Sequence, residues 1–151
     1  MTQLIWDDSF SVGVPELDRH HQRLAELINE LAASQDKPAH SEEIVDILSA
    51  LSDYANYHFA HEEHLMGVHG YPDLADHLSE HNVFCEMVAN ACYQATCSAL
   101  DLPALLAYLC TWWEDHILRV DIKYKPFLAP QHRPPAARRR PVLSGSTTAG
   151  I

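Results

Sequence analysis

Tyr57 to His81 reads YHFAHEEHLMGVHGYPDLADHLSEH, and this segment decides the architecture of the chain. A Gly-Tyr-Pro break at residues 70–72 divides it into two helical halves. Each half carries two potential metal ligands four residues apart: His58 with Glu62, and His77 with His81. A spacing of four places both side chains on nearly the same face of an α-helix. When the two halves fold back on each other, the pairs converge, so the segment predicts a metal site between helices.

The composition is that of an acidic chain rich in histidine. The 151 residues carry a net charge of −11 and include 11 histidines. This length suits one domain with a real core. So acidic a chain is not expected to bind nucleic acid as its main partner, and the excess of histidine indicates metal binding.

Neither a membrane segment nor a disulfide framework is expected. No apolar run approaches the roughly 20 residues that a membrane span needs, and the N-terminus lacks the pattern of a signal peptide. We therefore expect a cytoplasmic protein without a membrane partner. The cysteines are then expected to be reduced thiols, since none forms a C-x-x-C pair: Cys85, Cys92, Cys97 and Cys110.

Four amphipathic helices account for most of the chain. Apolar residues recurring three and four apart predict them over residues 15–34, 42–68, 72–100 and from 101 onward. Pro15 suits a first helical turn, and Ser41 and Asp101 suit N-caps. Pro126 must end any regular helix. Residues 1–14 are expected to form an extended arm along the body.

These elements predict an all-α fold, an antiparallel up-down four-helix bundle over residues 1–129. Residues 130–151 are rich in proline, arginine and serine and are expected to be a disordered tail. A second interpretation makes this tail a docking peptide, with Val142 and Leu143 as its apolar anchor.

Every predicted helix places histidine on its apolar stripe: His21, His58, His77 with His81, and His116. Burying five imidazoles and the Glu62 carboxylate without strong partners would cost several kcal/mol, which metal binding would offset. The alternative is a buried polar network without metal. Imidazole and carboxylate ligands favour iron, manganese, zinc or copper, and these ligands are too many for one zinc. Asp121 follows His116 by five residues, about 140° around a helix, so it can join the site only if the helix is distorted there or its side chain reaches across.

Four motifs carry a family resemblance: a His at the end of Leu17-Asp18-Arg19-His20-His21, then H58-x-x-x-E62, H77-x-x-x-H81 and H116-x-x-x-x-D121. Their flanks agree as well: Glu63-His64-Leu65-Met66, Gly70-Tyr71-Pro72 and Asp121-Ile122-Lys123-Tyr124. Over residues 4–128 the chain resembles hemerythrin, specifically the bacterial single-domain hemerythrins.

The resemblance implies a site with two iron ions. One would be held by His77, His81 and His116, and the other by His21 and His58. Glu62 and Asp121 would bridge them together with an oxo or hydroxo group, which leaves one coordination position open on the second iron.

The function that follows from the resemblance is reversible binding of dioxygen for storage, delivery or sensing, without enzymatic turnover. Small anions such as azide are expected at the same position. Phe59, Trp113 and Ile117 are the predicted oxygen pocket. The alternatives are a di-iron enzyme with peroxidase-like or nitric-oxide chemistry, and a protein that handles iron.

Four positions depart from the expected pattern or leave a choice open. His20 stands where relatives often have glutamine, and we expect it to point off the buried stripe, leaving His21 as the ligand. Trp113 replaces a leucine, and it either narrows the oxygen pocket or packs between helices. Cys85 and Cys92 lie on the inner stripe of the third helix, and we interpret them as small core residues rather than redox or metal groups.

Overall fold

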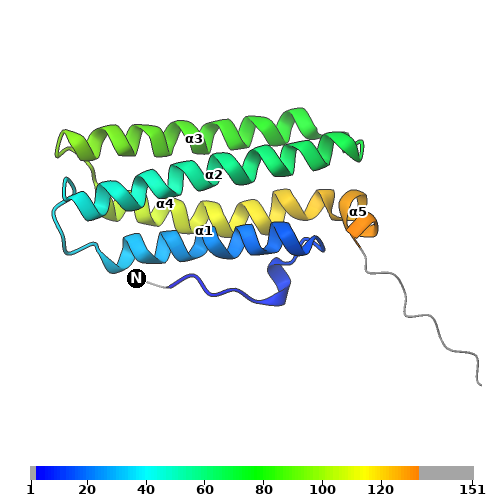
Figure 1. Cartoon of the computed structure of the whole chain (residues 1–151), viewed down its shortest axis with the longest axis horizontal. Coiled ribbons are helices and arrows are strands. Elements are labelled where there is room, and N and C mark those ends of the chain that lie inside the picture. Colours follow the sequence, from blue (N-terminus) through cyan, green and yellow to red (C-terminus); the bar gives the residue numbers. More distant parts are fainter. Residues whose placement is uncertain (1–2, 133–151) are drawn as a thin grey trace, which may run out of the picture.

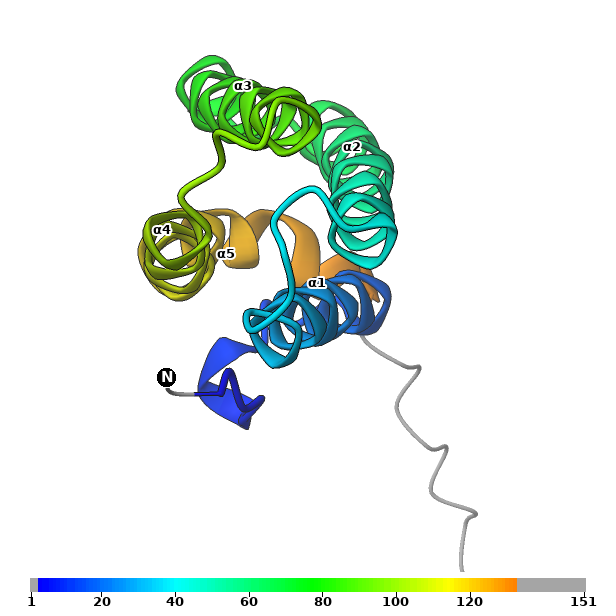
Figure 2. The ribbon, with the colours of Figure 1, turned by 90° about the vertical axis from the view of Figure 1, so that its left-hand side faces the viewer.

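Four long helices run antiparallel in up-down order in the computed structural model, which describes residues 3–132 (Figure 1). They are α1 (Pro15–Ala33), α2 (Glu42–Val68), α3 (Leu74–Thr96) and α4 (Leu102–Asp115). Figure 2 shows them at the corners of a bundle, with α5 (Lys125–Leu128) across the far end. No strand occurs between residues 3 and 132, so the predicted four-helix bundle is confirmed.

The helix starts follow the predicted capping chemistry. The Ser41 hydroxyl accepts a hydrogen bond from the Ile44 amide at 3.4 Å, and the Asp101 carboxylate accepts one from the Ala104 amide at 3.0 Å. Pro15 occupies the first turn of α1. Each arrangement satisfies or removes a backbone donor that the first turn leaves unpaired.

Helix α3 ends at Thr96, four residues before the predicted end at Leu100. The chain turns at Ser98, whose φ of 54° lies in the left-handed region, and the Ala99 amide bonds back to the Gln94 carbonyl at 2.9 Å. Glycine usually occupies such a position, and serine gives no comparable sequence signal. The predicted end was therefore wrong by about one turn.

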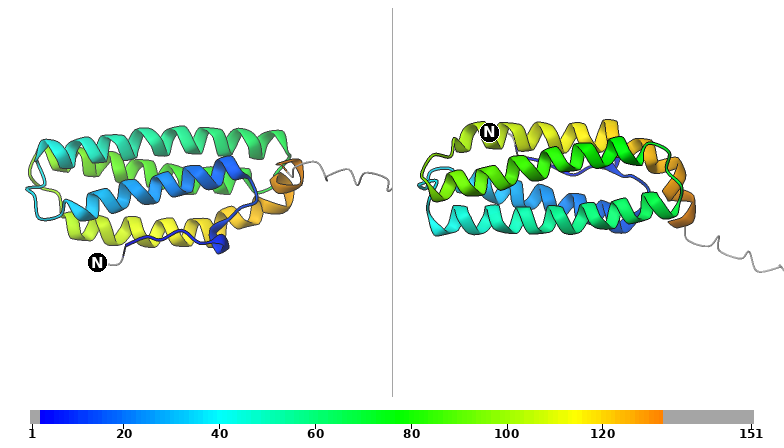
Figure 3. Two further views of the ribbon diagram at one scale, coloured as in Figure 1. Left: turned by 60° about the horizontal axis from the view of Figure 1, so that its bottom comes forward. Right: turned by 90° about the horizontal axis from the view of Figure 1, so that it is seen from above.

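The N-terminal arm packs along α1 and α4, as predicted (Figure 3). The backbone of Leu4 exchanges two hydrogen bonds of 2.9 Å with the Asn29 side chain. The Phe10 ring, in a short turn at Asp8–Phe10, lies 4.7 Å from the Trp113 ring. Gly13 has a φ of 75°, and a β-carbon there would come within 2.7 Å of the Ala129 side chain. The arm thus joins the hydrophobic core through aromatic contacts and one close backbone approach.

Helix α4 does not continue regularly to Pro126. A π-helical turn, η2 (His116–Val120), follows it, and then a 3-10 turn, η3 (Asp121–Tyr124), leads to α5. A last 3-10 turn, η4 (Ala129–His132), contains the only described part of the predicted tail, and the remainder lies outside the described residues. Within residues 3–132 no helix is long and apolar enough to cross a membrane.

The up-down order decides where the predicted ligands lie. His21 is near the start of α1, His58 near the end of α2, His77 near the start of α3, and His116 just after α4. In an antiparallel bundle these four places share one end, which here is the end that α5 covers (Figure 1).

Candidate metal centre

All seven predicted ligand residues lie in the core at one end of the bundle. The five histidines are at most 3% exposed, and Glu62 and Asp121 are fully buried. Their ligand atoms form two groups, in each of which all atoms lie within 4.8 Å of one another. The first group is Glu62, His77, His81, His116 and Asp121; the second is His21, His58 and Glu62.

The two carboxylates divide their oxygens between these groups. Glu62 Oε1 lies 2.8 Å from His77 Nε2 and 3.2 Å from His81 Nε2. Glu62 Oε2 lies 3.2 Å from His58 Nε2 and 3.5 Å from His21 Nε2. Each oxygen thus faces a different set of imidazoles, which is the arrangement that a carboxylate bridging two metal ions requires.

Asp121 divides its two oxygens in the same way. Its Oδ1 lies 3.0 Å from His116 Nε2 and 3.2 Å from His77 Nε2. Its Oδ2 lies 3.2 Å from His21 Nε2. The site therefore offers one position with three histidines and one with two, and both carboxylates reach both positions.

The π turn is what brings Asp121 into the site. The Asp121 amide bonds to the His116 carbonyl five residues back, so the helix is wider there than an α-helix. This widening turns the Asp121 side chain toward His116. Of the two ways in which Asp121 could join the site, a distorted helix or a side chain that reaches across, the structure contains the distortion.

The pKa values show how the charges balance. Burial alone would raise the pKa of Glu62, but the surrounding histidines outweigh it and hold the pKa well below its usual value. Burial also opposes protonation of His21 and His77, yet their contacts with Asp121 and Glu62 raise both pKa values to about 9. Attraction between these imidazoles and the two carboxylates therefore offsets part of the cost of burying their charge in the metal-free chain.

His58 behaves differently. Burial lowers its pKa to about 4, and the attraction of Glu62 only partly opposes this shift. A neutral imidazole is the form that binds a metal ion, so His58 is ready to act as a ligand at neutral pH.

Several buried polar atoms have no hydrogen-bond partner among residues 3–132. They include both ring nitrogens of His21, the Nδ1 of His77 and both carboxylate oxygens of Asp121. His21 Nε2 comes within 3.2 Å of Asp121 Oδ2 and 3.5 Å of Glu62 Oε2 without a hydrogen bond to either. Buried polar groups are normally paired, so a self-sufficient polar network does not account for this cluster. A metal ion between the groups would satisfy them.

The outer nitrogens of two rings and one carboxylate have polar partners. Glu63 Oε1 lies 2.8 Å from His81 Nδ1, and Glu80 Oε2 lies 3.3 Å from His116 Nδ1. The Tyr124 hydroxyl donates a hydrogen bond of 2.9 Å to Glu62. Such partners fix the orientation of the rings and turn Nε2 inward. Sequence reasoning missed all three residues, although each lies in a motif flank or beside a ligand.

His20 is not where the sequence placed it. It is only 6% exposed, and its Nδ1 lies 3.3 Å from the Nδ1 of His58. The buried face of α1 is wide enough to include both His20 and His21, so the expectation that His20 points off the stripe was wrong. It belongs to neither ligand group, and His21 holds that place.

The predicted oxygen-pocket residues all lie close to the ligands. The Phe59 ring stacks on His81 with the centroids 3.8 Å apart, and Ile117 is buried beside His116. Trp113 Nε1 donates a hydrogen bond of 3.0 Å to the His21 carbonyl while its ring packs on the arm. Trp113 therefore packs between elements, and its predicted contact with oxygen remains a prediction.

One aromatic contact was missed. The Trp112 ring stacks on His116 with the centroids 4.2 Å apart and the planes 12° apart. Trp112 precedes His116 by four residues, a spacing that brings two side chains together on one helix face, so this contact could have been predicted.

The cysteines stay outside the ligand groups of the described residues. Cys85 and Cys92 are half-buried, and burial raises the pKa of both thiols. The Cys85 thiol donates a hydrogen bond of 3.3 Å to Asn56. A raised pKa is typical of structural cysteines rather than reactive ones.

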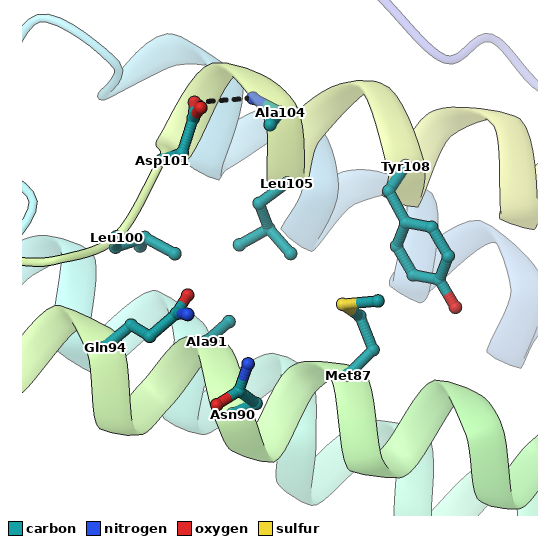
Figure 4. Close-up of a pocket in the computed structure, with 9 residues that line it drawn as sticks. All are labelled: Met87, Asn90, Ala91, Gln94, Leu100, Asp101, Ala104, Leu105 and Tyr108. Carbon is teal, nitrogen blue, oxygen red and sulfur yellow. Dashed lines mark hydrogen bonds between the residues drawn. The ribbon is translucent and has the colours of Figure 1, made fainter.

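A hollow of about 280 Å³ between α3 and α4 lies apart from this centre (Figure 4). Met87, Ala91 and Leu105 give it an apolar floor, and Tyr108 stands at one end. None of the seven ligand residues lines it, so it is separate from the metal centre.

The family model described as the hemerythrin HHE cation binding domain matches residues 12–128. The chain belongs to the hemerythrin family. A bacteriohemerythrin of Clostridium acetobutylicum is 30% identical to it, over 80% of this chain and 97% of the relative. A myohemerythrin of Riftia pachyptila is 31% identical, over 80% of this chain and 90% of the relative.

Solved hemerythrin structures have the same fold. Wild-type hemerythrin superposes with a TM-score of 0.79 at 27% identity, over 85% of this chain and 99% of the other. The family membership and the geometry agree, because a cation-binding domain is matched where the structure gathers seven side chains that could hold metal ions.

Proposed function

We propose that this hemerythrin-family chain binds dioxygen reversibly at a non-haem di-iron centre. The observation that carries the proposal is the division of the carboxylate oxygens between a group with three histidines and a group with two. This division provides two metal positions that differ in the number of their nitrogen ligands.

The residues that would hold each iron follow from the two groups. His77, His81 and His116 would hold one iron, and His21 and His58 the other. Glu62 and Asp121 would bridge them, with an oxo or hydroxo group completing the bridge. When bound, the two irons supply the electrons and the open coordination position that reversible dioxygen binding needs.

The ligand set fits iron. Imidazole with carboxylate suits iron, whereas a single tetrahedral zinc would leave three of the seven side chains unused. The two carboxylate charges also limit the net positive charge that two ferrous ions would bring into an apolar bundle.

The surroundings favour binding over turnover. Phe59, Ile117 and Trp113 keep water from the centre, since each is at most 3% exposed. Tyr124 holds the bridging Glu62 by its hydrogen bond and is itself fully buried, with a pKa raised well above the usual value by burial and by the nearby carboxylates. It therefore stays a neutral donor. Five histidines outnumber two carboxylates, in contrast to the carboxylate-rich di-iron oxidases.

Cycles of oxygenation test the proposal. The reduced, iron-loaded chain is exposed to air and then to an inert gas while its visible spectrum is recorded. We expect an oxygenated spectrum that reverses over repeated cycles. Rapid irreversible oxidation together with turnover of peroxide or nitric oxide would show an enzyme instead.

A further inference from the structure

A small polar hollow opens at the covered end of the bundle, between the start of α3 and the turns that follow α4. Its volume is about 80 Å³. Its lining residues are Tyr71, Asp73, Asp76, His77, Glu80, Val120 and Lys123. At roughly 30 Å³ per water, it has room for a cation with one or two water molecules.

The outer wall of this hollow is acidic. Asp73, at the N-cap of α3, lies four residues before His77, Asp76 lies one before it and Glu80 three after it, so all four side chains share one helix face. The three carboxylates are exposed, and Lys123 is the one basic residue in the lining. Burial raises the pKa of Tyr71, and the charges of Asp73, Asp121 and Asp76 raise it further. The negative field therefore extends from the rim of the hollow to Asp121, one of the two carboxylates proposed to bridge the irons.

The inner wall is a ligand of the proposed centre. His77 is only 2% exposed, and its Nε2 faces Glu62 and Asp121. Its Nδ1 is buried and has no partner among the described residues. Nδ1 is therefore the polar atom that His77 has left to offer to the hollow, and the imidazole separates the hollow from the metal centre.

We propose that this hollow is the entry port through which ferrous ions reach the centre, an inference that rests on the proposed function. The three carboxylates concentrate divalent cations at the rim, because a concave acidic site raises the local concentration of ions of opposite charge. The hollow admits an ion stripped of most of its water, and His77 is the first side chain of the centre that it meets. Movement of the His77 ring then passes the ion inward to the carboxylates.

The test compares rates of ferrous loading in the full chain, stripped of iron and checked by circular dichroism to retain its helices. Fe²⁺ is added without oxygen, and loading is stopped at set times with a colorimetric ferrous chelator. The port variant carries Asp73→Asn and Asp76→Asn. The control carries Glu42→Gln and Asp46→Asn. These changes remove the same charge from exposed positions in the first turns of α2, at the end of the bundle away from the hollow.

We expect the port variant to load about five to ten times more slowly than the control at low ionic strength. The difference should largely disappear near 1 M salt, where the screening length is about 3 Å. Lys123→Gln should load faster than the unmodified chain, which a purely structural role of this wall would not cause. All four proteins should reach the same final iron content.

Equal rates in the port variant and the control would overturn the entry port. A lower final iron content in the port variant would also overturn it, since the aspartates would then be holding iron rather than passing it. Failure of the unmodified chain to reach two irons would instead contradict the proposed function. If the stripped chain loses its helices, uptake of ⁵⁷Fe²⁺ into the loaded proteins gives the same comparison.

Discussion

The hydrogen bond from Tyr124 to Glu62 offers a direct test of how the centre is supported. Both side chains are fully buried, and the bond is 2.9 Å long. Tyr124→Phe removes the hydroxyl and little else, because the ring keeps its place beside Tyr71 and His77. Glu62 then loses its one described hydrogen-bond donor that is not a histidine.

The expected cost follows from the charge of the acceptor. A hydrogen bond to an ionised group contributes about 1.5–3 kcal/mol to stability, more than one between neutral groups. Because the Glu62 pKa is held well below its usual value, the acceptor is ionised at neutral pH. We therefore expect Tyr124→Phe to lower the free energy of unfolding by about 1.5–3 kcal/mol.

Urea unfolding of the metal-free chain, followed by far-ultraviolet circular dichroism, measures this free energy without the added effect of iron loss. Tyr93→Phe is the matched control, since Tyr93 is 68% exposed and its loss of a hydroxyl should change stability by less than about 0.5 kcal/mol. If the two variants unfold at the same urea concentration, the Tyr124 bond does not support Glu62 as described.

Four further outcomes are expected. His77→Ala should lose iron while His64→Ala, which changes an exposed side chain, should keep it, as metal analysis of both proteins will show. Trp113→Leu should cost about 2–4 kcal/mol in urea unfolding, because it removes core volume and the bond to His21; faster azide binding in the same variant would place Trp113 in the oxygen pocket. The pKa values of His21 and His77, raised to about 9, stabilise the metal-free chain below pH 6.5, so its melting temperature should fall as the pH rises from 6.5 to 9. Deletion of residues 131–151 should leave iron content, oxygen spectrum and melting temperature nearly unchanged, and a large loss in any of them would place the tail in the fold.

The helices and six of the candidate ligands could be predicted because helical periodicity places them on the buried faces. His58 with Glu62, and His77 with His81, are spaced by four on helices that the structure leaves regular. Asp121 was different. Regular helix geometry points it away from His116, and only the family resemblance included it, because the π turn that redirects it has no clear sequence signal.

The remaining misses have separate physical causes. The turn after α3 has Ser98 in the left-handed conformation, where a glycine would have allowed the helix end to be predicted. His20 is buried because α1 packs over a broader face than a stripe of residues three and four apart describes. Glu80 and Tyr124 support ligands across the bundle, and such contacts depend on how the helices pack rather than on spacing along one helix.

Oxygen uptake by the reduced, iron-loaded chain tests the central claim most directly. We predict one dioxygen bound for every two irons, two irons for every chain, and full release when the oxygen is removed. Uptake that does not reverse, or a chain that holds one metal ion and binds no dioxygen, would contradict it.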